Sequence, residues 1–297
     1  MPPAAIRLQV GLGTDEGEGG AVKFAICNET FGDCPVERAF DFAAQCGYTG
    51  IEIAPFTLAT YVTEIPAGQR AAVRQAAEAA GLEVVGLHWL LAKTEGYHLT
   101  SPEAAVRAKT AEYLIELARF CADLGGRVLV FGSPAQRSLP RGVSKTEGMD
   151  FAADVFERLL PALEEANLVL ALEPLGPEET NFLNTAAEAV ELIGRLGSPH
   201  VRLHLDCKAM STEMVPMVEL IRRHASHLAH FHANDPNRRG PGFGNLDFVP
   251  ILHALSQIQY DGWVSVEVFD YTPGAKALAR QSIEYLRRCL NELPAAS

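Results

Sequence analysis

Four residues of the types that bind metal ions each end a short apolar run of the chain. These residues and their runs are Glu173 in LVLALE, Asp206 in VRLHLD, His232 in HLAHFH and Glu267 in WVSVE. Such runs are typical of buried strands, and a ligand at the same end of each strand predicts that the four side chains meet. Three carboxylates at one place repel each other strongly where the dielectric is low, so we expect a cation between them.

One imidazole with three carboxylates is a ligand set dominated by hard oxygen atoms. Among divalent cations it suits Mn²⁺ best, with Mg²⁺, Co²⁺ and Zn²⁺ as alternatives. A polar residue at a single strand end is unremarkable, because it can cap the next helix or pair with a basic group. Four in succession favour a metal centre.

The rest of the chain supplies the elements that would position these ligands. Eight apolar runs are predicted as strands, at 22–27, 49–55, 83–89, 126–133, 168–173, 201–206, 227–232 and 263–267. A helical spacing of apolar residues follows each strand, at 36–47, 67–82, 101–124, 148–166, 185–196, 211–223, 247–257 and 273–292. Eight such pairs predict the α/β class and a single (β/α)8 TIM barrel, in which catalytic groups lie at the C-terminal ends of the strands.

An open doubly wound sheet is the competing architecture. Neither GxGxxG nor GxxxxGK[ST] follows the first predicted strand, so nothing marks a nucleotide site there. Residues 1–20 are rich in glycine and acid without an apolar period, and we predict a mobile N-terminal leader before a catalytic barrel domain at 21–297.

Composition limits the partners of the protein. A formal charge of -12 over 297 residues disfavours nucleic acid, and no run reaches the ~20 uncharged apolar residues of a membrane span. Six cysteines are scattered without a CxxC pair, and the first residues do not form a signal peptide. We therefore expect a cytoplasmic protein with a small carbohydrate or other small polar molecule as its substrate.

From Val22 onward the chain resembles the sugar isomerases and epimerases of the xylose isomerase-like TIM barrel superfamily. Within that superfamily it is most similar to the ketose 3-epimerases, typified by D-tagatose 3-epimerase. The spacing of the ligands carries this resemblance, with 33 positions from Glu173 to Asp206, 26 from there to His232 and 35 to Glu267. The resemblance implies one divalent metal held by these four residues, Glu173 and Glu267 as an acid/base pair, and a homodimer or homotetramer.

The implied reaction is the isomerisation or epimerisation of a ketose or related small sugar. A metal ion would stabilise the negative charge of the enediolate that forms when the carbon beside the carbonyl loses its proton. If one glutamate removes this proton and the other returns one to the opposite face, the centre is inverted. Return of the proton to the neighbouring carbon would instead interconvert aldose and ketose. A lyase that uses the same enolate, such as a dehydratase or a 3-keto-glycoside eliminase, and a non-catalytic sugar-binding barrel are the alternatives.

The resemblance also points to two substrate contacts, Glu179 and Arg238, which lie six residues after Glu173 and His232. One departure concerns the histidine that the epimerases carry three residues after the aspartate ligand. Ala209 occupies this position and cannot donate a hydrogen bond, which argues against 3-epimerisation of a free ketohexose. Lys208 is a candidate replacement, although a solvent-facing lysine fits the sequence equally well.

Other polar residues near the predicted strand ends are further candidates. His88 and Trp89 would offer a hydrogen-bonding ring and an apolar wall to a sugar. Glu52 would contact substrate or orient a ligand. His204 and His230, each two residues before a ligand, should point into the barrel and either fill its core or orient the ligands.

Basic residues in two loops leave a phosphorylated substrate open. The segment 237–248 contains two arginines and several glycines before a predicted helix, and Gln136 and Arg137 lie in the long loop 133–148. Either loop would suit a phosphate group or the distal hydroxyls of a sugar.

Overall fold

Eight parallel strands pair in sequence order and close on themselves, because the last strand also pairs with the first. The structure, a computed structural model, describes residues 22–294. Its strands are β1 (Lys23–Cys27), β2 (Gly50–Ile53), β3 (Glu83–Leu87), β4 (Val128–Phe131), β5 (Val169–Leu172), β6 (Val201–Asp206), β7 (Leu228–Ala233) and β8 (Trp263–Val266). The predicted (β/α)8 barrel is thereby confirmed, whereas the predicted leader at 1–20 lies outside the described residues.

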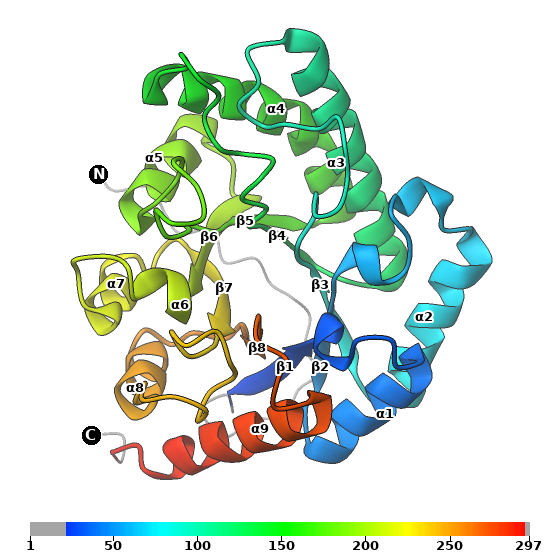
Figure 1. The fold of residues 1–297 in the computed structure, drawn as a ribbon, viewed down its shortest axis with the longest axis vertical. Coiled ribbons are helices and arrows are strands. Elements are labelled where there is room, and N and C mark those ends of the chain that lie inside the picture. The colour runs from blue at the N-terminus through cyan, green and yellow to red at the C-terminus, as the bar shows by residue number, and fades with distance from the viewer. Residues whose placement is uncertain (1–21, 295–297) are drawn as a thin grey trace.

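Helices surround the barrel as an outer ring (Figure 1). They are α1 (Val36–Cys46), α2 (Ala67–Ala79), α3 (Ala104–Leu124), α4 (Lys145–Ala166), α5 (Ala186–Leu196), α6 (Cys207–Met210), α7 (Met217–Arg223), α8 (Val249–Gln257) and α9 (Ala275–Asn291). Three short 3-10 turns, η1 (Asn28–Phe31), η2 (Pro55–Thr57) and η3 (Val62–Glu64), belong to the loops after β1 and β2. Within residues 22–294, no helix combines the length and the hydrophobicity that a membrane crossing requires.

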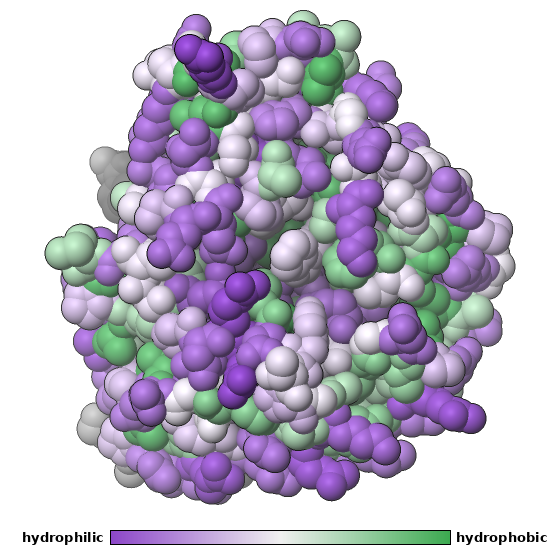
Figure 2. All heavy atoms as spheres, in the orientation of Figure 1, coloured by the Kyte–Doolittle hydropathy of each residue, from purple (hydrophilic) through white to green (hydrophobic). Residues whose placement is uncertain are grey.

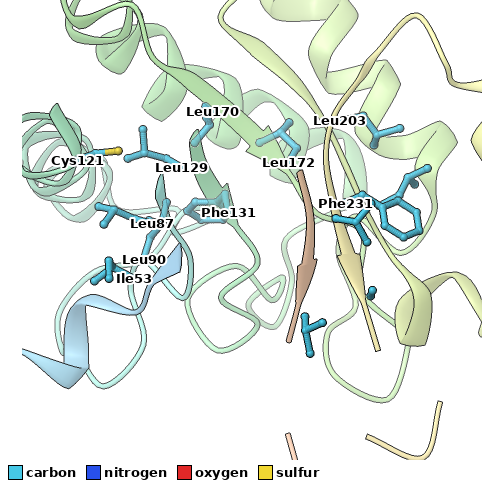
Figure 3. Close-up of a cluster of buried hydrophobic side chains, with 14 of the residues drawn as sticks. Ile53, Leu87, Leu90, Cys121, Leu129, Phe131, Leu170, Leu172, Leu203 and Phe231 are labelled. Atoms are coloured by element: carbon cyan, nitrogen blue, oxygen red, sulfur yellow. The ribbon is translucent and has the colours of Figure 1, made fainter. Parts of the chain in front are cut away.

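The strands present one face to the helices and the other to the barrel interior. Leu170, Leu172, Leu203 and Phe231 belong to a continuous core that β4 to β7 share with the surrounding helices (Figure 3). Burial of these side chains is the main force that holds the helices against the barrel.

The alternate positions of β6 and β7 point inward and are polar. Asp206 pairs with His232 across the two strands, and His204 pairs with His230 two residues earlier on each strand. Side chains alternate along a strand. Because Leu203 and Phe231 face the surrounding helices, these four residues face the barrel interior. The predicted inward direction of His204 and His230 is confirmed.

Helix boundaries differ from the prediction at three places. Helix α4 starts earlier than expected, because Ser144 and Glu147 form a capping box at its N-terminus. Helix α3 was expected to begin at Ser101 but begins at Ala104, with Glu103 as its N-cap. The single helix predicted at 211–223 is wrong: α6 ends at Met210, and the next helix starts only after Pro216.

Candidate active site

The carboxyl ends of β5, β6 and β7 bring three of the predicted metal ligands together. Glu173 directly follows β5, Asp206 ends β6, and His232 is the penultimate residue of β7. One potential ligand atom from each lies within 4.8 Å of the others, and a ring nitrogen of His204 belongs to the same group. All four side chains are buried. Three strand ends therefore converge as expected, and His204 adds a donor that we did not predict as a ligand.

Glu267, the fourth predicted ligand, follows β8 and joins the group through His232. Its Oε2 lies 2.9 Å from Nδ1 of His232, and its Oε1 accepts a hydrogen bond of 2.8 Å from Nε1 of Trp89. Burial alone raises the pKa of Glu267, but the neighbouring His232 brings this pKa below its usual value. The indole of Trp89 thus holds Glu267 in place, a contact that the sequence did not predict.

The carboxylates of Glu173 and Asp206 lie in a different electrostatic environment. Burial raises the pKa of Glu173 well above its usual range, and the charges of Glu267 and Asp206 raise it further. Burial and the charge of Glu267 likewise raise the pKa of Asp206 to about 6. The three carboxylates are therefore close enough to repel one another, as the sequence predicted.

Glu52 lies beneath this group and is fully buried. Its carboxylate accepts hydrogen bonds from Nε2 of His230 at 2.8 Å and from Nε2 of His232 at 3.1 Å, and Nδ1 of His88 lies 3.7 Å away. Burial raises the pKa of Glu52, but His230 and His232 together bring it well below its usual value. Of the two roles considered for Glu52, this position favours the orientation of a ligand over contact with substrate.

Two partners of His88 were missed in the sequence. Nε2 of His88 lies 2.8 Å from Oε2 of Glu29, and Cys27 offers a sulfur atom to the same cluster. Cys27 ends β1 and Glu29 lies two residues later in η1, so the signal was similar to that of the other ligands, a polar residue near a strand end. The turn-forming residues after it obscured that signal.

Asn234, two residues after His232, also contacts a proposed ligand. Its side-chain amide donates a hydrogen bond to Oδ2 of Asp206, and its Oδ1 accepts one of 2.8 Å from the backbone N–H of Lys208. The other oxygen of Asp206 caps α6 through the backbone N–H of Ala209, at 2.7 Å. Position 209, where the epimerases carry a histidine, therefore fixes Asp206 through its backbone rather than a sugar through its side chain.

Lys208 and Glu179 form an ion pair beside the site. Nζ of Lys208 lies 2.6 Å from Oε2 of Glu179 and 4.7 Å from the centre of the Phe269 ring, and the lysine side chain is only 13% exposed. Lys208 is thus directed toward the barrel mouth and not toward solvent. Glu179 lines the inner chamber at this mouth.

Two neighbouring spaces lie at the mouth of the barrel. The inner chamber, of about 20 Å³, is lined by residues that include Glu173, Glu267, Glu179 and His88. The vestibule, of about 1090 Å³, lies outside it and is lined by the loops after β1, β2, β3, β4, β7 and β8. Trp89, Pro134 and Phe269 line both spaces and therefore lie between them.

Of the residues considered for phosphate binding, Gln136 and Arg238 line the vestibule, whereas Arg137 and Arg239 have partners within the protein. Arg137 is fully buried and donates hydrogen bonds to the backbone carbonyls of Glu173, at 2.5 Å, and of Leu183. Arg239 pairs with Asp270. Of these three arginines, Arg238 lines the vestibule. Arg137 therefore anchors the main chain at Glu173 and is not available to a substrate.

Gly132 makes room for Glu173. A Cβ atom at this position would lie 1.6 Å from Oε2 of Glu173, so no other residue fits while the glutamate keeps its position. Gly132 follows β4, the strand beside β5 in the barrel.

The donor groups fit a divalent cation. The charges of Glu267 and Asp206 raise the pKa of Glu173, and neither ring nitrogen of His204 has a hydrogen-bond partner among the described residues. A set of carboxylate oxygens with imidazole nitrogens is typical of Mn²⁺ and related ions, and the charge of such an ion would relieve the repulsion.

Comparison with known proteins agrees with this geometry. A family model described as xylose isomerase-like TIM barrel matches residues 40–289. The chain belongs to this family. D-psicose 3-epimerase of Agrobacterium fabrum is 30% identical over 244 residues, which are 78% of each protein. D-psicose 3-epimerase of Enterocloster bolteae is 38% identical over 106 residues, but these cover only 36% of this chain and 35% of that protein.

Solved structures of the family share the fold. A crystal structure of D-psicose 3-epimerase in the presence of D-fructose has a TM-score of 0.80, at 22% identity, and the match covers 91% of this chain and 99% of the other. The predicted resemblance to the xylose isomerase-like superfamily and its ketose 3-epimerases is thus confirmed.

Proposed function

We propose that this protein is a divalent-metal-dependent sugar epimerase, with Glu173 and Glu267 as its acid/base pair. The observation that carries the proposal is that both glutamates line one inner chamber at the barrel mouth. Glu173, Asp206, His232 and Glu267 are the proposed ligands, and Mn²⁺ is the cation that suits them best. The relatives that are named 3-epimerases support a carbohydrate substrate.

When bound, the cation would stabilise the negative charge that develops on the oxygens of the sugar. Glu173 and Glu267 come from β5 and β8, which are not neighbours in the barrel, so they can reach a sugar from different sides. One removes the proton beside the carbonyl, and the other returns a proton to the opposite face of the resulting enediolate. The N–H of Trp89 keeps Glu267 oriented for this transfer.

The remaining polar residues at the mouth have separate proposed roles. Lys208 and Glu179 bind sugar hydroxyls together, because their ion pair lies beside the inner chamber. Arg238 reaches the substrate from the vestibule, and His88 from the wall of the inner chamber. Glu52 positions His232 and is not itself a substrate contact.

Exchange with solvent tests the proposal. The Mn²⁺-loaded protein, given a panel of free and phosphorylated ketoses and inososes in heavy water, should introduce deuterium at the carbon beside the carbonyl of an accepted sugar. Glu267→Gln and Glu173→Gln should each slow this exchange by about 10²- to 10⁴-fold, because the acid/base group is lost. Glu219→Gln, on an exposed glutamate paired with Arg223, is the matched control and should retain the wild-type rate.

Metal analysis of each variant separates a lost base from a lost metal. Exchange that survives in metal-loaded Glu267→Gln would contradict the two-carboxylate scheme. An unsaturated product that absorbs in the ultraviolet would identify a lyase, and sugar binding without exchange would identify a non-catalytic barrel.

A further inference from the structure

The vestibule is much larger than a single sugar needs. Pockets that enclose drug-sized ligands measure about 300–1,000 Å³, and the vestibule, at about 1090 Å³, slightly exceeds that range. A monosaccharide that places its carbonyl carbon between Glu173 and Glu267 would leave most of this space to water. The size of the vestibule therefore indicates a substrate that extends outward from its reacting sugar.

Aromatic side chains line the vestibule from four different loops. They are Phe31 after β1, Phe56 after β2, Trp89 after β3, and Phe269 and Tyr271 after β8. Seen from this side of the molecule, hydrophobic surface lies among hydrophilic residues near the centre of the face (Figure 2). Aromatic rings gain stabilisation by packing on flat apolar faces, including other rings. These residues favour a substituent with such faces.

The charges of the vestibule do not favour a phosphate. Lys93 and Arg238 line it, but so do Glu29 and Asp33, and Nζ of Lys93 lies 4.1 Å from the centre of the Phe56 ring. A site for a phosphate group has a clear excess of donors and positive charge. Because the two basic side chains are balanced by two carboxylates, the vestibule suits an uncharged part of a substrate.

The inner chamber and the vestibule share part of their lining. Trp89 and Phe269, whose ring centres lie 6.1 Å apart, border both spaces together with Pro134. A molecule that reaches from the glutamates into the vestibule would therefore contact these side chains, with its far end among the aromatic residues.

We infer that the natural substrate is a keto-sugar that carries a bulky, uncharged substituent, either a second sugar ring or an aryl group. The keto-sugar occupies the inner chamber and its entrance, and the substituent packs against the aromatic residues of the vestibule. This inference rests on the proposed function and specifies its substrate class.

Two matched pairs of sugars test the inference. Isomaltulose is D-fructose with a glucosyl group on O6, and phenyl 3-keto-β-D-glucoside differs from methyl 3-keto-β-D-glucoside only in its aglycone. Deuterium exchange in heavy water gives kcat/KM for each compound. In at least one pair, kcat/KM should be about tenfold or more higher for the larger sugar, because each aromatic contact contributes a factor of roughly 2 to 10.

Tyr271 offers a substitution that is safe for folding, since its side chain is 45% exposed. Tyr271→Ala should lower the ratio of kcat/KM between the larger and the smaller sugar of the favoured pair several-fold. Tyr271→Phe, which keeps the ring, should leave this ratio unchanged. Met214, the other exposed large apolar residue of the described chain, does not line the vestibule. Met214→Ala is the matched control and should leave the preference unchanged.

Each result supports or overturns the inference. Equal or lower kcat/KM for both larger sugars overturns it while leaving the epimerase proposal intact. A preference that Tyr271→Ala does not alter also overturns it, because the substituent would then bind elsewhere. Exchange with none of the four sugars, from protein that contains its metal, counts against the proposed function itself.

Discussion

Around the ends of β1, β2 and β8, carboxylates are paired with rings that donate hydrogen bonds, whereas the carboxylates at the ends of β5 and β6 have no such partners. In the first region, which we call the paired half, Glu29 contacts His88, Glu52 contacts His230 and His232, and Glu267 contacts Trp89 and His232. These contacts lie at 2.8 to 3.1 Å.

In the second region, the open half, Asp206 receives hydrogen bonds from neutral donors alone, and the Glu173 carboxylate has a long contact of 3.9 Å with His204. The pKa values differ accordingly. Glu52 and Glu267 have a lowered pKa, whereas Glu173 and Asp206 have a raised one. Histidine and tryptophan rings stabilise the charge of the paired half, whereas the open half is where we propose that the cation binds.

The largest effect is expected from the centre of the paired half. Glu52→Gln removes a buried negative charge that accepts hydrogen bonds from two histidines. Removal of one partner from a buried ion pair lowers the free energy of unfolding by about 3 kcal/mol. Metal affinity should also fall by roughly 10- to 100-fold, because His232 loses the group that orients it. Chemical denaturation and Mn²⁺ titration measure the two effects.

The same substitution at an exposed ion pair is the control for Glu52→Gln. Glu78 pairs with Arg74 on the surface of α2, so Glu78→Gln should change stability by less than about 1 kcal/mol. If both variants behaved alike, the hydrogen-bonded network of the paired half would have no special energetic role.

The open half should make metal binding depend on pH. The pKa of Asp206 is raised from 3.8 to about 6. Between these two pH values Asp206 is therefore mostly protonated, whereas an ordinary aspartate is ionised. A protonated carboxylate is not a ligand, so the affinity for Mn²⁺ should fall about tenfold for each pH unit below about 6. Calorimetric titration at pH 7, 6 and 5 measures the slope, and an affinity independent of pH would mean that the open half does not bind the cation.

The smallest effect is expected at the link between Trp89 and Glu267. Trp89→Phe keeps an aromatic ring but removes the N–H that Glu267 accepts, so kcat/KM should fall by about tenfold. The pKa of Glu267 should rise, and the acid limb of the rate profile should move to higher pH. Trp263→Phe, at the other tryptophan of the chain, is the control, because Trp263 begins β8 far from its carboxyl end. An unmoved acid limb in Trp89→Phe would contradict the role given to this hydrogen bond.

The barrel and the converging ligands could be predicted because each depends on a short local pattern. Glu173, Asp206, His232 and Glu267 adjoin apolar runs of their own, and parallel strands place their carboxyl ends at one face. No long-range contact had to be known to bring them together.

The paired half could not be predicted in the same way. The contact between His88 and Glu29 joins residues 59 positions apart, and the contact between His232 and Glu52 joins residues 180 positions apart. Such contacts depend on side-chain rotamers and on the bulge between His204 and Leu203, neither of which a single sequence reveals. The error at 211–223 was avoidable, since Pro216 lacks a backbone N–H and a proline inside a helix usually interrupts it.

The glycine at position 132 has a consequence for anyone who would redesign this barrel. An oxygen of Glu173 lies in the volume that a side chain at position 132 would fill, so a larger residue there would displace this carboxylate. If Glu173 is an acid/base group, as we propose, a library randomised at 132 should retain solvent exchange mainly in clones that carry glycine, whereas the loops around the vestibule are free of this constraint.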